Sequence, residues 1–412
     1  MYVKSCAPPN KVVCWEDIDF NIAKAFVKKL QRRIYVAYSQ GNVGKVNTLI
    51  HLMLHSFYAK ACAVQHVCST HGKKTAGIDG VLWLTDSEKF NAIFDLRLRG
   101  YKPSPLKRVY IKKKNGHFRI LGIPTMKDRA FQTLYRFALE PISEVLSDEH
   151  SYGFRQGRNV KDAILQLEKY VSKNPKCEWI LKADIESCFD NISHEWLLKN
   201  VQVFTPLLRK FLKAGFIKQN VWYPTDRGIP QGGSVSSVLC NLTLDGLERR
   251  CNDIIPCGVI RYADDFIIIS DDKQTLVQEV IPAVENFLNE RGLKLSETKT
   301  SLENIRDGIT FLGWKVYKGN KKVQVFPSNT ALQTLWEKIE EILIAQELSE
   351  KTKITRITHV IKGWMTFYSR ASYPFFLDIE YLLVQGINQL SGERYPVEKI
   401  FEDLEKKRGE IY

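Results

Sequence analysis

Apolar residues near the N-terminus recur at the spacing of amphipathic helices. They fall in two stretches, at Ile22, Phe26, Leu30 and Ile34 and then at Leu49, Leu52 and Met53. Because side chains three and four positions apart share one face of a helix, the chain up to about residue 75 is predicted to be helical. The stretch Thr75–Gly80 contains two glycines and is predicted to be a loop that ends this helical region.

Short apolar runs further along the chain are typical of β-strands. Val109–Ile111 and Phe118–Leu121 flank Asn115-Gly116, a pair that is favoured in hairpin turns. Other strands are predicted at Trp179–Leu181, on both sides of an aspartate turn within Gly258–Ile269, and at Phe311–Tyr317 and Lys322–Phe326 around Lys318–Asn320. Three hairpins are therefore expected.

Helical patterns lie between and after these strands. Lys273–Glu290 is predicted to be helical, and after Pro327 two amphipathic helices follow, the first capped by Ser328 or Asn329. Their apolar positions are Leu332, Leu335, Trp336, Ile339, Ile342 and Leu343 in one and Ile354, Ile357, Ile361, Trp364, Met365 and Tyr368 in the other. The aromatic residues on these stripes are interpreted as core rather than base-stacking residues. This irregular order of elements predicts an α+β fold with a helical C-terminal domain from about residue 330.

Length and composition are those of a globular protein of two or three domains. The chain has 412 residues, of which 44% are hydrophobic and 26% charged, so disorder, collagen and coiled coil are poor interpretations. The net charge of +14 and the pI of about 9.2 favour a polyanionic partner. Nucleic acid is expected first and an anionic membrane surface second.

Targeting and cysteine signals are weak. No run approaches the roughly 18 apolar residues of a spanning helix, and Met1–Asn10 lacks the apolar middle of a signal peptide, so a cytoplasmic location without a membrane is expected. The nine cysteines include no Cys-x-x-Cys pair, which favours free thiols. Cys62, His66, Cys68 and His71 could hold zinc, but their irregular spacing favours buried thiols and surface imidazoles.

A basic stretch coincides with the first predicted hairpin. Between Leu96 and Lys127 there is no acidic residue and there are ten lysines and arginines. A solvated surface is the simple interpretation. The hairpin would nevertheless present several cations together at its turn and edges, and we favour an interpretation in which it contacts phosphates.

Three aspartates lie where predicted strands end or turn. They are Asp184, directly after the strand at residue 179, and the adjacent pair Asp264 and Asp265. A carboxylate pair inside an apolar hairpin is costly unless positive charge holds it. Two Mg²⁺ ions would do so, and such a pair can activate an attacking hydroxyl and stabilise a leaving oxygen in phosphoryl transfer. Taken alone, the Tyr-x-Asp-Asp tetrapeptide is weak evidence.

Seven ordered motifs surround these aspartates. They are Leu121-Gly-Ile-Pro124, Ser151-Tyr-Gly-Phe-Arg-Gln-Gly-Arg158, Ala183-Asp-Ile-Glu-Ser-Cys-Phe-Asp190, Gly228-Ile-Pro-Gln-Gly-Gly233, Tyr262-Ala-Asp-Asp265, Gly292-Leu-Lys-Leu295 with Lys299-Thr300, and Phe311-Leu-Gly-Trp314. This succession resembles the blocks of reverse transcriptases, especially the bacterial group II intron type, over nearly the whole chain. Seven blocks in this order are highly specific.

The resemblance implies a right-hand polymerase fold with fingers, palm and thumb, a helical N-terminal extension and a helical C-terminal thumb. The implied boundaries are 1–85 for the extension, 86–178 for the fingers, 179–327 for the palm with the Gln-Gly loop and the primer-grip hairpin, and 328–412 for the thumb or maturase-like region. The implied activity is RNA-directed DNA polymerisation, with RNA template, dNTPs and DNA product as partners.

The resemblance also assigns roles to single residues. Asp184, Asp264 and Asp265, with the Ile185 backbone carbonyl, would bind two Mg²⁺ ions, for which Mn²⁺ could substitute. Phe189 matches a steric gate against ribonucleotides. The other implied nucleotide-binding residues are Lys113, Arg119, Gln231, Gly232 and Lys299, the last with a surface-lysine alternative, and the implied primer grip is Phe311, Leu312, Gly313 and Trp314.

The biological role is left between alternatives. The chain ends at Tyr412, which leaves no room for the endonuclease extension of many mobile intron proteins. This favours a free-standing antiviral defence enzyme that works with a non-coding RNA over an intron-encoded maturase for splicing and mobility. A third hypothesis is an RNA-binding scaffold that has lost catalysis. The intact aspartates argue against it.

Overall fold

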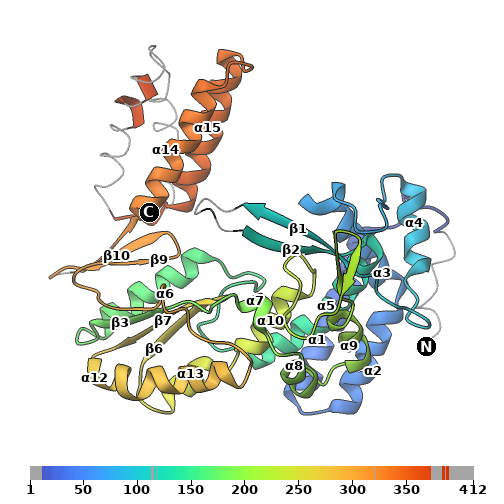
Figure 1. Ribbon diagram of the computed structural model, residues 1–412, viewed down its shortest axis with the longest axis horizontal. Helices are drawn as coiled ribbons and strands as arrows, with labels where there is room; N and C mark the ends of the chain where they lie inside the picture. Colours follow the sequence, from blue (N-terminus) through green and yellow to red (C-terminus); the bar gives the residue numbers. More distant parts are fainter. Residues whose placement is uncertain are drawn as a thin grey trace.

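The computed structural model describes residues 12–112, 116, 118–320, 322–372, 383–385 and 387–388. The fold is α+β: helices gather around three separate sheets in irregular order (Figure 1). The N-terminal helices lie at one end, and α14 and α15 project at the other, facing the tips of strands β1 and β2 (Figure 1). No described helix is long and apolar enough to cross a membrane.

The N-terminal region is helical, as predicted. It contains α1 (Phe20–Ser39), α2 (Val43–His55), α3 (Phe57–Ser69), a 3₁₀ turn (His71–Lys74) and α4 (Asp86–Asp95). Asp19 caps α1 through its side chain, and residues 75–80 are non-helical. The predicted apolar face of α1 was wrong in part. Ile22 is 53% exposed, and the buried face is instead formed by Ala23, Val27, Leu30, Ile34 and Ala37.

The first sheet has the order β2-β1-β4-β5 and joins strands about a hundred residues apart. Strands β1 (Leu106–Lys112) and β2 (Phe118–Ile123) form the predicted hairpin, and Lys112 pairs with Phe118. Strand β4 (Phe216–Lys218) pairs with β1 in parallel and with β5 (Val221–Tyr223) in an antiparallel hairpin. The Gly122 N–H donates a hydrogen bond to the Gln231 carbonyl at 3.0 Å, which ties this sheet to the Gln-Gly loop.

The central sheet is antiparallel and has the order β6-β7-β3-β8. Its strands are β3 (Trp179–Ala183), β6 (Gly258–Tyr262), β7 (Asp265–Ser270) and β8 (Ser301–Asn304). The helices that lie between β2 and β8 in the chain are α5 (Met126–Leu146), α6 (Val160–Lys173), α7 (Cys188–Asn191), α8 (His194–Asn200), α9 (Thr205–Leu212), α10 (Ser236–Leu244), α11 (Leu247–Asn252), α12 (Lys273–Thr275), a π-helical turn (Leu276–Val280) and α13 (Ile281–Asn289). The helix predicted over Lys273–Glu290 thus contains a π turn.

The third sheet leads into the C-terminal helices. Its strands are β9 (Ile309–Phe311), β10 (Trp314–Lys318) and β11 (Val323–Pro327), and the helices are α14 (Asn329–Ile344), capped by Ser328, and α15 (Glu350–Phe367). The prediction of one continuous strand over Phe311–Tyr317 was wrong. Leu312 and Gly313 have positive φ values of 51° and 83° and form a tight turn between β9 and β10. Besides the main hydrophobic core, the described residues form a second cluster of buried apolar side chains. Tyr368 belongs to this cluster, and Trp336 and Trp364 pack against it, which confirms their assignment to the core.

Candidate active site

Strand pairing brings the three aspartates together. Asp184 directly follows β3, Asp264 lies in the turn between β6 and β7, and Asp265 begins β7. Because Ala183 of β3 pairs with Phe266 of β7, the residue after β3 and the residue before Phe266 meet at the same edge of the sheet. Residues that are 80 positions apart in the sequence therefore share one site.

A groove of about 770 Å³ opens beside this edge. Most of the residues that the sequence assigned to the site line it, namely Arg119, Asp184, Ile185, Phe189, Gln231, Gly232, Asp264 and Lys299. Asp265 is exposed at the same turn and does not line the groove. Lys113 lies outside the described residues.

Charge in the groove is dominated by crowded carboxylates and one ammonium. Lys299 Nζ lies 2.5 Å from Asp184 Oδ2, and this ion pair raises the pKa of Lys299. Burial, followed by the nearby Asp184 charge, raises the pKa of Asp264. The pKa of Asp265 rises to about 6 because its carboxyl is partly desolvated at the turn and lies beside the Asp264 and Asp184 charges. The turn therefore carries more negative charge than its surroundings neutralise, and it would gain from added cations.

The donor set fits hard divalent cations. It consists of carboxylate oxygens and a backbone carbonyl oxygen beside a polar groove. Mg²⁺ prefers oxygen ligands of this kind. Among the described residues, however, no group of three or more His, Cys, Asp or Glu side chains lies in an arrangement that could hold a metal ion. That statement covers Cys62, His66, Cys68 and His71, so the structure does not support zinc at these residues. A metal at the aspartates would have to draw further ligands from substrate phosphates or water.

Two aromatic rings line one part of the groove. Phe189 on α7 meets Phe154 edge to face, with ring centroids 6.2 Å apart and planes at 89°. Opposite, Gln231 Nε2 makes a long contact of 3.5 Å with Asp190 Oδ2. Gly232 has a φ of +116°, a conformation that a side chain would disfavour. The Gln-Gly loop is thereby held against Gly122 of β2.

The hairpin at Phe311–Trp314 is anchored by the helices that follow it. Trp314 is fully buried, and its ring lies 4.7 Å from that of Tyr368. The Tyr368 hydroxyl and the Ser328 N–H both donate to the Gly313 carbonyl, at 3.1 and 2.9 Å. The turn between β9 and β10 is therefore fixed relative to α14 and α15.

A buried ionic network behind the Asp264–Asp265 turn was missed by sequence reasoning. Asp245 Oδ1 accepts from Arg155 Nη2 at 2.6 Å and from Arg261 Nη2 at 2.5 Å, and both arginine side chains are 1% exposed. Arg261 also donates to the Ala263 carbonyl and to Asn241. Arg155 lies within the Ser151–Arg158 motif and Arg261 directly precedes Tyr262–Asp265, but nothing local in the sequence indicates that the two arginines share an aspartate.

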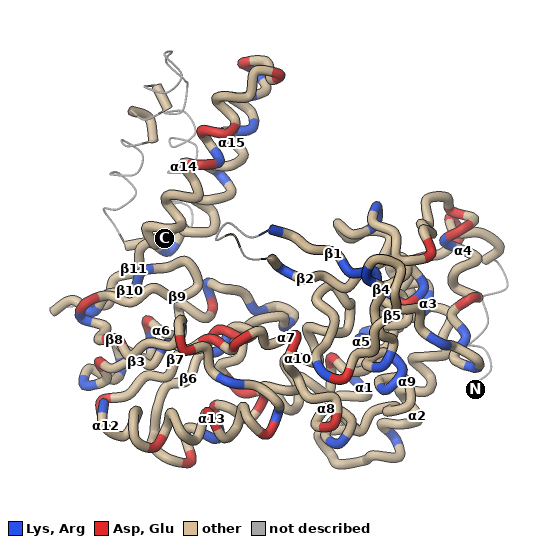
Figure 2. The backbone as a smooth tube through the Cα atoms, viewed as in Figure 1, with Lys and Arg blue, Asp and Glu red and all other residues tan. Residues whose placement is uncertain are grey.

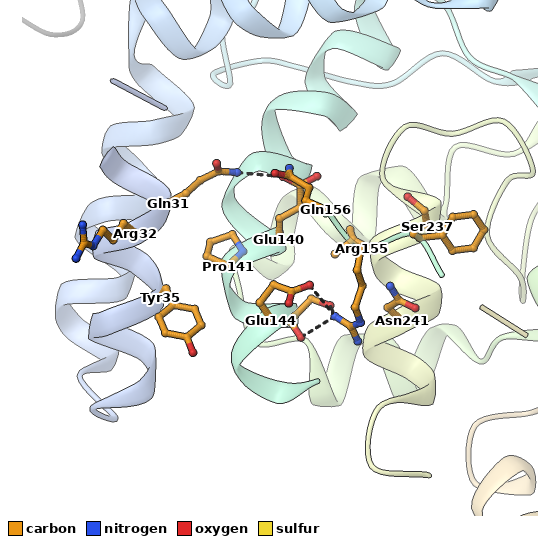
Figure 3. A pocket seen from close by; sticks show the side chains of 13 residues that line it. Gln31, Arg32, Tyr35, Glu140, Pro141, Glu144, Arg155, Gln156, Ser237 and Asn241 are labelled. Atoms are coloured by element: carbon orange, nitrogen blue, oxygen red, sulfur yellow. Dashed lines mark hydrogen bonds and ion pairs between the residues drawn. The ribbon is translucent and has the colours of Figure 1, made fainter. Parts of the chain in front are cut away.

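This network borders a second cavity of about 300 Å³ between α1, α5 and α10. Figure 3 shows Arg155 bonded to Glu144 on one side of it, with Gln31 and Tyr35 of α1 across from them. Phe154 and Ser237 line both this cavity and the groove with the aspartates. The two spaces are therefore separated by only a few side chains.

Comparison with known proteins matches this arrangement to a family. Residues 111–316 match the family described as "Reverse transcriptase (RNA-dependent DNA polymerase)", and residues 15–96 match "N-terminal domain of reverse transcriptase". The chain belongs to the reverse transcriptase family, whose enzymes are RNA-directed DNA polymerases that depend on divalent metal. The predicted right-hand polymerase class and the enzyme class are confirmed.

Individual relatives carry the comparison further. Protein YkfC of Escherichia coli (strain K12) is 29% identical over 340 residues, covering 71% of this chain and 88% of that protein. Group II intron-encoded protein LtrA of Lactococcus lactis subsp. cremoris is 34% identical over 350 residues, covering 68% of this chain and 58% of LtrA. Maturase-like protein 1 of Euglena gracilis is 26% identical, covering 82% of this chain and 74% of that protein. The chain thus spans less than two thirds of LtrA.

Proposed function

We propose that this protein extends a 3′-hydroxyl along an RNA template by Mg²⁺-dependent addition of dNTPs. The observation that carries the proposal is the meeting of Asp184 with the Asp264–Asp265 turn at one edge of the central sheet, beside a groove that also holds Phe189 and Gln231. Family membership supports the reaction class.

Asp184, Asp264 and the Ile185 carbonyl would hold the cations, with Asp265 as a supporting carboxylate. When bound, two divalent ions activate the attacking hydroxyl and stabilise the leaving oxygen. The chain's own residues supply the remaining functions. Lys299 forms an ion pair with Asp184 at 2.5 Å. With bound cations neutralising Asp184 instead, the Lys299 ammonium would be available to contact the departing pyrophosphate.

The fingers hairpin and the Gln-Gly loop would bind the nucleotide. Arg119 and Lys113 would hold the triphosphate. The Arg119 charge already acts on the Asp264 carboxyl, where it opposes the rise in pKa that burial causes. Phe189 would exclude a 2′-hydroxyl by occupying the space beneath the sugar. Gln231 and Gly232 would contact the templating pair, and the Phe311–Trp314 turn would support the primer end.

We propose two alternative biological roles, which differ in the RNA that the protein would bind. One is antiviral defence with a dedicated non-coding RNA. The other is an intron-encoded maturase and reverse transcriptase, and the names of the relatives LtrA and Maturase-like protein 1 favour this second setting. Both require binding of a structured RNA and fit the net charge of +14.

The test is primer extension on RNA with purified full-length protein, Mg²⁺ and dNTPs, compared with Asp264→Asn/Asp265→Asn. Loss of metal ligation removes several kcal/mol of transition-state stabilisation, so we expect cDNA synthesis to fall about 10³-fold or more while RNA affinity persists. Undiminished synthesis by the variant would refute the site assignment. A wild-type protein that binds RNA yet makes no cDNA with Mg²⁺ or Mn²⁺ would favour the scaffold hypothesis.

A further inference from the structure

Gln132 on α5 holds a buried oxygen atom that lacks a hydrogen-bond donor. The residue is 3% exposed, and no described residue donates a hydrogen bond to its Oε1 atom. A buried acceptor without a donor costs free energy, because water would pair with it in the unfolded chain. Such atoms are rare in native folds, and each one needs a physical explanation.

This oxygen lies against the Gln-Gly loop. A Cβ built on Gly233 would lie 2.9 Å from Gln132 Oε1 and 2.7 Å from Ser236 Oγ. Gly233 is outside the positive-φ region, so a side chain is excluded here by lack of space and not by backbone conformation. Gly233 lines the groove beside Asp184, whereas Gln132 does not. Gln132 can therefore act on a bound nucleotide only through the loop.

The Pro230–Gly233 turn has two ways to pair its backbone. The Gly233 N–H now donates to the Pro230 carbonyl at 3.0 Å, and the positive φ of Gly232 at the third position is typical of a type II turn. The same carbonyl also accepts from the Ser236 hydroxyl at 2.8 Å. If the Gly233 N–H donated to Gln132 Oε1 instead, the Pro230 carbonyl would keep a donor, and both acceptors would be paired.

We propose that Gln132 is a positioning residue for nucleotide binding. Without nucleotide, the Gly233 N–H donates to Pro230 and the Gln132 oxygen is unpaired. When an incoming nucleotide contacts Gln231 and Gly232, the turn shifts and the Gly233 N–H donates to Gln132 Oε1. Because this hydrogen bond exists in only one of the two states, it favours the nucleotide-bound loop. The inference rests on the proposed function, which assigns Gln231 and Gly232 to the nucleotide site.

The test variant is Gln132→Met, which keeps the length of the side chain and removes the acceptor. Because an apolar group replaces an unpaired polar one, the nucleotide-free variant should melt at or above the wild-type temperature. Its affinity for dNTP should nevertheless fall about fivefold, since the bound state loses a hydrogen bond. A purely structural role of Gln132 would instead lower the melting temperature and leave the dNTP affinity of the folded protein unchanged.

The dNTP affinity is measured without catalysis. Full-length protein is bound to an RNA template annealed to a DNA primer that lacks a 3′-hydroxyl, and the complementary dNTP is titrated with Mg²⁺. The readout is the dNTP concentration that half-protects this complex from a competing duplex. A protein that binds dNTP here but does not extend a normal primer would contradict the proposed polymerisation, and the comparison of variants would still decide the role of Gln132.

Thr133→Val is the matched control. Thr133 is the next residue on α5, is fully buried, and donates its hydroxyl to the Arg129 carbonyl within the same helix. We expect the dNTP affinity of Thr133→Val to equal that of the wild type.

Ser236→Ala tests the exchange of hydrogen bonds itself, because it removes the second donor to the Pro230 carbonyl. It should weaken dNTP binding in the wild type and have little further effect in the Gln132→Met background. The proposal would be overturned by wild-type dNTP affinity or a lowered melting temperature of Gln132→Met, by equal loss in Thr133→Val, or by additive effects of Gln132→Met and Ser236→Ala.

Discussion

At the scale of single residues, the site depends on where a few side chains meet the groove. Phe189 is an example. Its position on α7 and its contact with the ring of Phe154 determine where its side chain lies in the groove. Under the proposed function, this ring would fill the volume that an additional hydroxyl on the sugar needs. The sequence motif implies the gate, and the groove lining places the ring beside Asp184.

Replacement of Phe189 with valine should relax sugar selection. We expect the preference for dNTP over rNTP, measured as the ratio of kcat/KM values, to fall about 10- to 100-fold because the excluded volume opens. Phe154→Val provides the control, as that ring lines the same groove from the far side of Phe189. An unchanged preference in the Phe189 variant would remove this residue from the gate.

The Asp265 carboxyl gives a pH dependence with a defined sign. Its pKa of about 6 in the folded protein exceeds the usual value, so the folded state retains the proton longer than the unfolded chain does. Without metal, stability contributed by this group is present at low pH and is lost as pH rises toward and through 6. Bound Mg²⁺ should reverse this trend, since it favours the ionised form.

Thermal melting checks the prediction. Above pH 7 and without metal, Asp265→Asn should melt at a higher temperature than the wild type, and Mg²⁺ should raise the melting temperature of the wild type more than that of the variant. Below pH 6 the carboxyl becomes protonated, so the affinity of the wild type for Mg²⁺ should fall about tenfold per pH unit. A variant that melts below the wild type in metal-free buffer would contradict the assignment of charge crowding at this turn.

At the scale of elements, the Asp264–Asp265 turn is supported by the loop at residues 150–155, which packs against it. Arg261 N–H donates to the His150 carbonyl, and Tyr152 N–H donates back to the Arg261 carbonyl, at 2.9 and 2.8 Å. Gly153 lies so close that a Cβ there would come within 2.3 Å of the Ala263 nitrogen. Ala263 itself has a φ of 58°, in the left-handed region. This strained turn needs support from outside its own hairpin.

Arg261 is predicted to position the turn without contacting substrate. Arg261→Lys keeps the charge beside Asp245 but cannot bridge Asp245, Asn241 and the Ala263 carbonyl together. We expect kcat to fall at least about tenfold with KM for dNTP little changed, and the Mg²⁺ concentration for half-maximal rate to rise.

Arg291→Lys is the matched control, because Arg291 is also buried and donates to the Thr243 and Phe287 carbonyls away from the turn. A melting curve for each variant separates loss of folding from loss of positioning. If both variants lose the same activity and show the same Mg²⁺ dependence, the effect of Arg261 is general stability.

At the scale of the whole molecule, the open question is which RNA the protein serves. The helices α14 and α15 project on the side of the molecule toward which the tips of β1 and β2 point (Figure 1). Relatives include proteins named as a group II intron-encoded protein and a maturase-like protein. The two proposed roles differ in the RNA that the protein would hold in cells.

Sequencing of RNA and DNA that co-purify with the protein from cells distinguishes the two settings. An intron-encoded maturase should retain intron lariat or its precursor. A defence enzyme should retain one discrete non-intronic RNA together with complementary DNA. The absence of complementary DNA in either case, with RNA retained, would favour a role in RNA folding or splicing over copying.

The sequence by itself determined the elements with local causes and the identity of the chemistry. Hairpin residues, helix caps and the seven motifs depend on neighbours in the chain, so the β1–β2 hairpin, the Ser328 cap and the aspartate turn were all predictable. The Leu312–Gly313 turn and the exact buried face of α1 were not, because apolar spacing does not say which side a neighbouring element covers.

Only the tertiary structure decided which distant groups meet. The parallel pairing of β4 with β1 joins strands about a hundred residues apart into one sheet (Figure 2), and the packing of α10 and β6 brings Arg155 and Arg261 to one aspartate. The Lys299–Asp184 ion pair likewise spans 115 positions. Such contacts depend on the path of the whole backbone, whereas periodicity and motifs report only a residue's immediate neighbours along the chain.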